Sequence, residues 1–312
     1  MRFDKIKIGV TSTSFSKDTD LRQALLSYFP RSRFNDKGGL LEKDALIRFL
    51  SNLDGAIIGR DPVDRYIIDN LSGLKVISKY GVGLDNIDPE ILKVAGIHLG
   101  WTAGVNAYYV AELTVCFILG LLRNIFITQN FLKFGQWVKE GGVGLPDKIV
   151  GIIGCGHIGK EVVRLLQPFR CKILVNDIVD YTEYYERYHV TPVSFKEILR
   201  ESKVISLHVP LDKSTYHMID KDALALMSHG SFLINTSRGP CVNTADLKRA
   251  LKTNTIAGAA LDVYDIEPID DDKLIRLPNL ICTPHIGGNA KEAIWAMGQS
   301  AINHLVKFFS SY

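Results

Sequence analysis

The sequence lacks a strong excess of either charge, and it lacks any long hydrophobic run. Its 312 residues carry a formal net charge of +3 and the basic residues are scattered, so neither a nucleic acid nor a membrane is indicated as a partner. The most apolar stretch, residues 115–122, is far shorter than the roughly 20 residues that a membrane-spanning helix needs. The N-terminus has no apolar core of signal-peptide length, and we therefore expect a cytoplasmic protein.

Paired cysteines are also missing. The five cysteines are an odd number and form no Cys-x-x-Cys pair: Cys116, Cys155, Cys171, Cys241 and Cys282. This count argues against a disulfide framework and against a bound metal, and it suits a reducing compartment. We interpret each cysteine as a small apolar filler rather than a nucleophile.

What is present is the composition and rhythm of an α/β protein with two domains. The hydrophobic share of 46% and the charged share of 23% are those of a soluble globular chain, and 312 residues are too many for one ordinary core. Strand-like and helix-like segments alternate twice, which predicts parallel sheets. The strands are expected at residues 6–10, 55–59, 74–79 and 97–101, and then at 149–153, 172–175, 204–209, 231–236, 256–263 and 280–283.

Two predicted helices stand outside this alternation. Residues 110–126 are apolar around much of the circumference, which predicts a helix buried between domains or subunits. Residues 290–309 follow the last strand and form an apolar stripe that could return to the first domain. Glycines near residues 100–104 and 287–288 suit the crossovers between domains, although they could equally be simple turns.

A glycine fingerprint lies between a strand-like run and a helix-like run. Gly154, Gly156 and Gly159 form a Gly-x-Gly-x-x-Gly pattern after residues 149–153 and before residues 161–169. The first glycine allows a tight turn, the second lets the backbone approach a pyrophosphate, and the third lets the helix pack closely. The helix start would then present N–H groups to the phosphates. This context indicates a dinucleotide site.

An acidic residue follows at the distance that such a site requires. Asp177 ends the next strand-like run, 18 residues after Gly159. Its carboxylate can accept hydrogen bonds from the two ribose hydroxyls and would repel a 2′-phosphate. No arginine occurs at residues 178–180 to bind such a phosphate. The pattern therefore favours NAD over NADP.

Five motifs in this order resemble the D-isomer-specific 2-hydroxyacid dehydrogenases, in the branch that includes D-3-phosphoglycerate dehydrogenase. They are residues 80–88 (YGVGLDNID), the glycine fingerprint, 234–239 (INTSRG), 261–268 (LDVYDIEP) and 283–288 (TPHIGG). The resemblance implies two doubly wound parallel-sheet (Rossmann-like) domains with the active cleft between them. Residues 1–101 and 289–312 would form the substrate-binding domain, and residues 102–288 an inserted NAD-binding domain. It also implies a homodimer, with the helix at 110–126 and the arm around Trp137 at the interface.

The resemblance further implies a catalytic set of Arg238, Glu267 and His285. His285 would be the general acid and base, because imidazole titrates near the operating pH. Glu267 would pair with the other ring nitrogen and favour the protonated ring. Arg238 would bind the substrate carboxylate and carbonyl oxygen with its rigid donor fork. Each residue alone could be an ordinary polar side chain at a strand end or turn.

Further site residues follow from the same resemblance. The cofactor contacts would be Gly154, Gly156, His157, Ile158, Gly159, Asp177, His208, Pro210, Thr215, Thr236, Asp262, His285 and Gly287. Asp262 would accept a hydrogen bond from the nicotinamide carboxamide. The substrate contacts would be Arg60, the backbone N–H groups of Val82 and Gly83, and Arg238.

Two features depart from the family pattern or leave alternatives open. Tyr108 and Tyr109 stand where many members have a small residue, so they would change the size or polarity of the cleft, or else pack in an interface. Arg60 could bind a second anionic group such as a phosphate, but Asp61 and Asp64 could equally neutralise it at the surface.

The sequence as a whole predicts an NAD-dependent oxidoreductase that acts on a D-2-hydroxy acid or 2-keto acid. 3-Phosphoglycerate is one candidate substrate. An alternative is a glyoxylate or hydroxypyruvate reductase on the same scaffold. Another is an NADH-sensing interaction protein similar to the co-repressors that share this fold. Turnover of a keto-acid panel separates the enzymes from the sensor.

Overall fold

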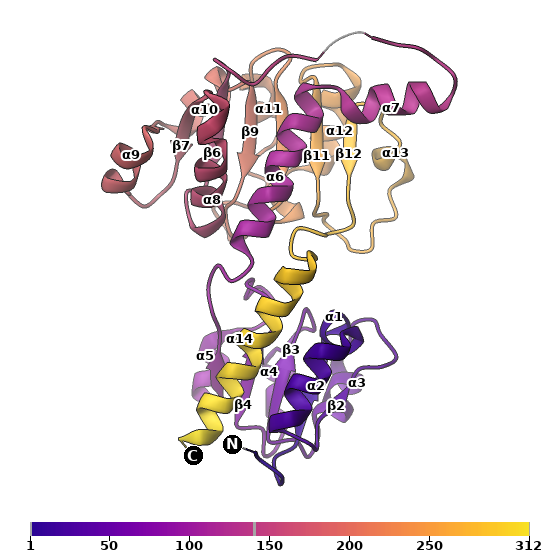
Figure 1. The fold of residues 1–312 in the computed structure, drawn as a ribbon, viewed down its shortest axis with the longest axis vertical. Coiled ribbons are helices and arrows are strands. Elements are labelled where there is room, and N and C mark those ends of the chain that lie inside the picture. The colour runs from indigo at the N-terminus through magenta and orange to yellow at the C-terminus, as the bar shows by residue number, and fades with distance from the viewer. Residues whose placement is uncertain (1, 140–141, 312) are drawn as a thin grey trace. The chain divides into compact units, whose positions relative to one another are not determined.

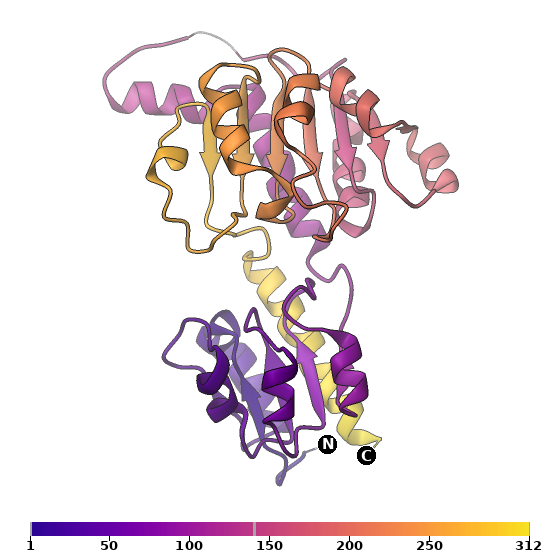
Figure 2. The ribbon, with the colours of Figure 1, turned by 180° about the vertical axis from the view of Figure 1, so that it is seen from behind.

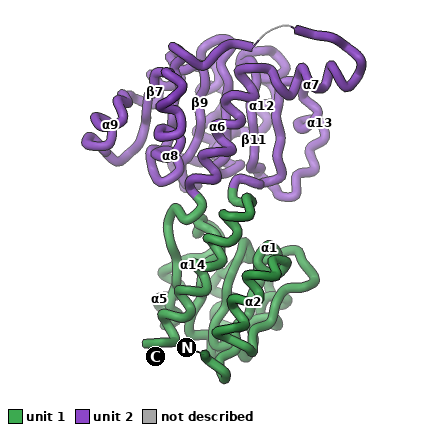
Figure 3. The backbone as a smooth tube through the Cα atoms, in the orientation of Figure 1, with its two compact units in different colours: residues 1–106, 288–312 green, residues 107–287 purple. Residues whose placement is uncertain are grey.

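The chain divides into two compact units (Figure 3). The computed structural model describes residues 2–139 and 142–311, and residues 1, 140, 141 and 312 lie outside the described residues. Unit 1 comprises residues 1–106 and 288–312, and unit 2 comprises residues 107–287. The chain thus passes from unit 1 into unit 2 after residue 106, rather than after residue 101 as expected. The reason is local: Val105 packs against the unit 1 core, and the Thr102 hydroxyl bonds to His304 in the same unit.

Unit 1 is built on a five-stranded parallel sheet. The strands are β1 (Ile8–Val10), β2 (Arg33–Phe34), β3 (Gly55–Ile58), β4 (Val76–Lys79) and β5 (His98–Gly100), in the order β2-β1-β3-β4-β5. All four strand pairs are parallel. The order reverses between β1 and β3, and such a reversal leaves a crevice outside the carboxyl ends of the strands.

Helices cover both faces of this sheet (Figure 1). One face packs against α1 (Thr13–Lys17), α2 (Thr19–Tyr28) and α14 (Lys291–Ser310), and the other against α3 (Lys43–Leu50), α4 (Arg65–Asp69) and α5 (Pro89–Val94). The C-terminal helix α14 therefore returns to unit 1. Its Ala301 carbonyl accepts a hydrogen bond from the buried Ser78 hydroxyl of β4 at 2.9 Å.

Unit 2 is built on a seven-stranded parallel sheet. The strands are β6 (Ile149–Ile153), β7 (Lys172–Asn176), β8 (Thr191–Pro192), β9 (Val204–Leu207), β10 (Phe232–Asn235), β11 (Gly258–Leu261) and β12 (Leu280–Cys282). Their order is β12-β11-β10-β9-β6-β7-β8, which reverses between β6 and β9. This is the strand order of dinucleotide-binding folds with one strand added. The expectation of two parallel-sheet α/β domains is confirmed.

Helices again lie on both faces (Figure 2). One core contains residues of α6 (Ala107–Leu122), α8 (His157–Leu166) and α9 (Thr182–Tyr188). The other contains residues of α10 (Phe195–Glu201), α11 (Lys221–Leu226), α12 (Thr244–Lys252) and α13 (Asp272–Ile275). Asn243 caps α12 as expected, because its side chain accepts a hydrogen bond from the Asp246 N–H.

The predicted single helix over residues 110–126 is wrong at its end. Helix α6 stops at Leu122, Asn124 takes a left-handed conformation with φ of 51°, and α7 (Ile125–Lys133) starts after it. Asparagine tolerates this backbone conformation better than most residues. Gly120 lets the chain fold back, because a Cβ there would lie 2.5 Å from the Phe126 ring.

No single helix among residues 2–139 and 142–311 is long and apolar enough to cross a membrane. Helices α6 and α7 reach that length and apolar composition only when they are taken together, and the chain bends by 63° at the break between them. Phe117, Ile118 and Leu122 of α6 are buried in the core of unit 2.

Candidate active site

The glycine fingerprint forms the turn between β6 and α8. Gly154 has φ of 92°, and a Cβ there would lie 2.6 Å from the His208 carbonyl oxygen, so two loops meet closely at the point where the strand order reverses. A Cβ at Gly159 would overlap the Gly154 carbonyl oxygen. Gly156 differs, because no atom lies within 4 Å of its Cβ position. The open space beside Gly156 suits the close approach of a pyrophosphate.

Helix α8 begins directly at this open space. Its N-cap residue is Gly156, which has no side chain to cap the helix, and its first residues are the exposed His157 and the half-buried Ile158. The N–H groups at the start of a helix attract anions, and the helix dipole adds to this effect. The chain therefore fits a dinucleotide at this turn.

Asp177 lies at the end of β7 beside the glycine turn. Its Oδ2 accepts a hydrogen bond from the Cys155 N–H at 2.5 Å, and its Oδ1 accepts one from the Val179 N–H at 2.8 Å. The carboxylate thus holds the turn in place. Ile178, the next residue, is fully exposed and offers an apolar surface beside the carboxylate. Burial raises the pKa of the Cys155 thiol to about 11, which agrees with the interpretation of this cysteine as a filler.

A tyrosine cluster next to Asp177 was not predicted from the sequence. The Lys160 Nζ lies 3.4 Å from the centroid of the Tyr181 ring, and the Tyr184 hydroxyl donates to the Lys160 carbonyl at 2.7 Å. The cation and the ring attract each other. The spacing of tyrosines along α9 was the available signal, since residues three and four apart share a helix face.

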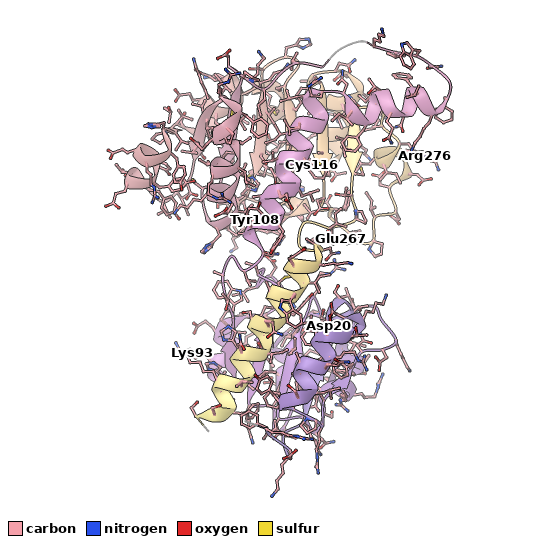
Figure 4. All side chains as sticks on the ribbon, viewed as in Figure 1. Asp20, Lys93, Tyr108, Cys116, Glu267 and Arg276 are labelled. Atoms are coloured by element: carbon pink, nitrogen blue, oxygen red, sulfur yellow. The ribbon has the colours of Figure 1, made fainter. Side chains whose placement is uncertain are left out.

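The structure brings Glu267 and His285 together. The His285 Nδ1 lies 2.7 Å from Oε2 and 2.9 Å from Oε1 of Glu267. Glu267 lies on the loop between β11 and α13 (Figure 4), and its Oε1 also accepts a hydrogen bond from the Tyr264 N–H at 3.2 Å. The pairing occupies one ring nitrogen of His285 and leaves Nε2 for a substrate.

Asp262 holds the loop that carries His285. Its side chain is only 1% exposed. Its Oδ1 accepts hydrogen bonds from the Thr283 hydroxyl at 2.5 Å and the Ile286 N–H at 2.8 Å. Its Oδ2 accepts one from the Gly287 N–H at 2.8 Å. His285 has φ of 54°, an unfavourable conformation for a residue with a Cβ, and these bonds keep it there.

Arg238 lies in a segment that packs against the loop of Glu267. The Arg238 side chain is half-buried, and its Nη1 donates to the Ser237 carbonyl at 2.8 Å. The Asn235 side chain donates to the Arg238 carbonyl at 2.8 Å and closes the turn after β10. A Cβ at Gly239 would overlap the Tyr264 backbone, so only glycine lets the two segments approach this closely.

His208 is a neutral histidine after β9. Its Nε2 lies 2.9 Å from the Ser206 hydroxyl, and its Nδ1 is buried without a hydrogen-bond partner. Burial lowers the pKa of His208 to about 3, so the ring carries no charge at neutral pH. The residue is partly exposed, but its Nδ1 is buried, so a proton added there would have no hydrogen-bond partner.

The other predicted cofactor residues occupy different settings. The Thr215 hydroxyl donates to the Pro210 carbonyl at 2.7 Å and accepts from the Asp212 N–H at 2.8 Å, so it closes its own loop. Thr236 is buried, and its hydroxyl lies 3.1 Å from that of Thr114 on α6. Neither hydroxyl is an open donor toward solvent. Among the described residues, no three His, Cys, Asp or Glu side chains are grouped so that they could hold a metal ion.

The predicted substrate contacts Arg60, Val82 and Gly83 lie in unit 1. Arg60 is exposed on the loop after β3. The Asp61 carboxylate beside it is buried and bonds to the Thr11 hydroxyl and the Leu41 N–H. The Asp64 side chain caps α4 by accepting a hydrogen bond from the Ile67 N–H, and the role of Arg60 stays a prediction.

The two tyrosines at the start of α6 pack against one another and against α8. The rings of Tyr108 and Tyr109 are perpendicular, with centroids 5.6 Å apart. The Arg164 guanidinium lies 5.5 Å from the centroid of the Tyr108 ring. Figure 4 labels Tyr108 at the beginning of α6, where the side chain is 43% exposed. Tyr108 is therefore still available for contacts with other groups.

Comparison with known proteins adds a family and relatives to this geometry. The family profile described as "D-isomer specific 2-hydroxyacid dehydrogenase, NAD binding domain" matches residues 115–287. The chain is 38% identical to the glyoxylate reductase of Thermococcus litoralis over 285 residues. This match covers 87% of this chain and 83% of the relative. The chain is 35% identical over 274 residues to the hydroxypyruvate reductase of Thermotoga maritima, covering 86% and 88%. It is also similar to the crystal structure of D-lactate dehydrogenase from Aquifex aeolicus complexed with NAD and lactic acid, with a TM-score of 0.85, 26% identity and coverage of 97% and 96%.

Proposed function

The chain belongs to the D-isomer-specific 2-hydroxyacid dehydrogenase family, and from this premise we propose that it is an NADH-dependent reductase of glyoxylate or hydroxypyruvate. The observation that carries the proposal is the Glu267–His285 pair, whose atoms lie 2.7 Å apart in the same unit as the glycine turn. A proton donor and a dinucleotide site are what the reduction of a keto group needs. Relatives named as glyoxylate and hydroxypyruvate reductases direct the choice of substrate.

The residues of this chain supply the proton and the binding groups for the reaction. NADH, when bound, would supply the hydride. His285 gives the proton on Nε2 to the carbonyl oxygen of the keto acid, while Glu267 holds Nδ1 and stabilises the imidazolium. Arg238 binds the substrate carboxylate with its planar donor fork. In unit 1, Val82 and Gly83 remain proposed contacts of the carboxylate through their N–H groups.

The choice of cofactor rests on Asp177. Its carboxylate lies beside the glycine turn, where its Oδ2 accepts from the Cys155 N–H. A 2′-phosphate there would bring like charges together. Asp262, which the sequence assigned to the nicotinamide carboxamide, has three hydrogen bonds to the His285 loop. A carboxylate has about four acceptor positions, so one remains for a carboxamide.

A panel of keto acids tests the function. We expect turnover of glyoxylate and hydroxypyruvate with NADH, and much lower kcat/KM with NADPH. The glycerate formed from hydroxypyruvate should be the D-isomer, which chiral chromatography measures. 3-Phosphohydroxypyruvate belongs in the panel, because Arg60 was the sequence-based reason to consider a phosphorylated substrate. A protein that binds NADH but turns over no keto acid would be a sensor rather than an enzyme.

A homodimer is the further part of the proposal. Helix α7 buries none of its residues, and the segment after it exposes Phe134 by 83% and Trp137 by 76%. Large exposed apolar side chains in one stretch indicate a protein interface. Sedimentation equilibrium should give a dimer, and Trp137→Lys combined with Leu132→Lys should give a monomer. A monomeric unmodified protein at micromolar concentration would contradict this part.

A further inference from the structure

Lys79 and Trp101 are polar side chains of unit 1 that have no role in the proposed mechanism. Both follow or end strands of the same sheet, since Lys79 is the last residue of β4 and Trp101 comes directly after β5. β4 and β5 are adjacent and parallel, so their carboxyl ends lie at one edge of the sheet. The loop of residues 81–86 leaves β4 at that edge and contains Val82 and Gly83.

The Trp101 indole holds one end of this loop. Its Nε1 donates a hydrogen bond to the Val82 carbonyl at 2.9 Å. The Val82 carbonyl and the Gly83 N–H belong to the same planar peptide unit, and in a trans unit they point in opposite directions. A donor that fixes the carbonyl therefore also fixes the direction of the Gly83 N–H, which points away from the indole.

The Lys79 ammonium holds the other end. Its side chain is only 5% exposed, and its Nζ donates to the Gly59 carbonyl and to the Asn86 Oδ1 at 3.0 Å. The Asn86 Nδ2 donates to the same Gly59 carbonyl at 3.1 Å and to the Asp61 carbonyl at 2.6 Å. These bonds join the loop after β4 to the loop that carries Arg60. A buried ammonium needs such partners, because its charge is costly to bury otherwise.

We propose that Trp101 is a positioning residue that aims the Gly83 N–H at the carboxylate of the keto acid, with Lys79 anchoring the far end of the same loop. The inference rests on the proposed function, in which the Gly83 N–H binds that carboxylate. It assigns a substrate-related role to two side chains of unit 1. Gly81, with φ of 101°, provides the turn at which the loop leaves the strand.

Trp101→Phe is the decisive variant, because it removes the N–H donor and keeps an aromatic ring. We expect KM for hydroxypyruvate to rise roughly tenfold, the effect of one lost positioning hydrogen bond of ordinary strength. The value of kcat should change much less, and the NADH dissociation constant, measured by fluorescence, should stay the same. Trp295→Phe on α14 is the matched control, since Trp295 is similarly exposed in unit 1 and should leave KM unchanged.

Lys79→Met and Lys79→Arg test the second anchor. Methionine has a similar length but no donor, so KM should rise as in Trp101→Phe, whereas arginine should retain part of the anchoring and rescue KM in part. Lys75→Met, which removes the Lys75–Asp54 ion pair just before the same strand, is the control and should leave KM unchanged. Melting temperatures of all variants separate loss of anchoring from loss of folding.

An unchanged KM in folded Trp101→Phe would overturn the proposal, even if Lys79→Met failed to fold. The outcome stays separate from that of the proposed function. If the unmodified protein turns over no keto acid, the proposed function is wrong, and calorimetric binding of oxamate to the NADH-loaded protein then decides the inference. Oxamate is an unreactive keto-acid analogue with the same carboxylate, and Trp101→Phe should weaken its binding roughly tenfold. Equal binding of oxamate by the unmodified protein and Trp101→Phe would overturn the proposal, and so would a lack of oxamate binding by both.

Discussion

The two units use the same kind of sheet but place different chemistry at the carboxyl ends of their strands. In unit 2 the edge carries a glycine turn after β6 and the Glu267–His285 pair beyond β11 and β12. In unit 1 it carries a buried network around Lys79 that ties two loops together. Both strand orders reverse once, and ligands of such α/β folds bind beyond the carboxyl ends of the strands at the reversal. The fold thus sets where a site can form, and the residues at the strand ends determine the chemistry of that site.

This difference predicts that the loss of a catalytic side chain from unit 2 abolishes turnover of the keto acid, whereas changes in unit 1 alter the affinity for the keto acid. The largest effect should come from His285→Ala. We expect kcat to fall roughly 10²–10⁴-fold, the usual contribution of general acid catalysis. NADH binding, measured separately by fluorescence, should persist. An active His285→Ala would remove the proposed mechanism.

Arg238→Lys should have the next largest effect. Lysine keeps the positive charge but loses the planar fork, so kcat/KM for hydroxypyruvate should fall on the order of 100-fold. The same change in unit 1, Arg60→Lys, should cost much less, because Arg60 is exposed and is not proposed to touch the reacting carbonyl. Steady-state kinetics of both variants measure the difference. Near-normal kinetics of Arg238→Lys would exclude the carboxylate role.

Two glycine variants, one in each unit, test whether only unit 2 binds the cofactor. In Gly159→Ala the new Cβ would overlap the Gly154 carbonyl oxygen, so the glycine turn must shift and NADH affinity should fall by roughly tenfold or more. In Gly59→Ala the new Cβ would lie 3.1 Å from the Ser12 Cβ in unit 1, a tight contact with no part in the cofactor turn. NADH titration should show a loss only in the first variant. Equal losses would contradict the division of roles.

Glu267→Gln sharpens the description of the catalytic pair. The amide keeps a similar size and an oxygen that can accept from Nδ1, but it removes the charge that stabilises the imidazolium. The amide can still orient the ring, so a loss of activity reports the missing charge. We expect kcat/KM for hydroxypyruvate to fall roughly tenfold, the effect of losing the charge from one hydrogen bond, while NADH binding stays the same. Steady-state kinetics measure this, and an unchanged kcat/KM would remove Glu267 from the role.

The smallest predicted effect concerns stability and is confined to unit 2. In the unfolded chain the His208 ring gains a proton as the pH falls below about 6.5. In the folded protein, burial lowers the pKa of His208 to about 3. Stability should therefore be unaffected above that range and be lost progressively between the two values. At pH 5 the loss amounts to about 2 kcal/mol of unfolding free energy. Denaturant titrations at pH 7 and pH 5 should show that His208→Gln loses less by this amount, and an identical loss would refute the burial argument.

Much of the candidate site follows from local sequence. The glycine turn lies between β6 and α8 as predicted, and Gly154 and Gly159 meet the steric demands expected of them. The pairing of Glu267 with His285 was also expected from the resemblance and is present. These features depend on short spacings, or on residue types that have few alternative uses at a strand end.

Other features could not be predicted because they depend on contacts between distant segments. The bend at Asn124 requires the Phe126 ring to reach Gly120, whereas the apolar pattern continues through the break. The three bonds of Asp262 to the His285 loop require β11 and β12 to be neighbours. The hydrogen bond from Trp101 to Val82 requires β4 and β5 to be neighbours in the same way.

The alternation of strands and helices, the glycine turn and the residue types at the strand ends follow from local sequence. These properties are local because hydrophobic periodicity and backbone sterics act over a few residues. Which strand ends are neighbours depends on the folded chain as a whole, and so do the support that Asp262 gives to His285 and the support that Trp101 gives to Val82. Hydrogen bonds are directional and short, so their partners exist only once the sheet order has brought the two loops within about 3 Å of each other.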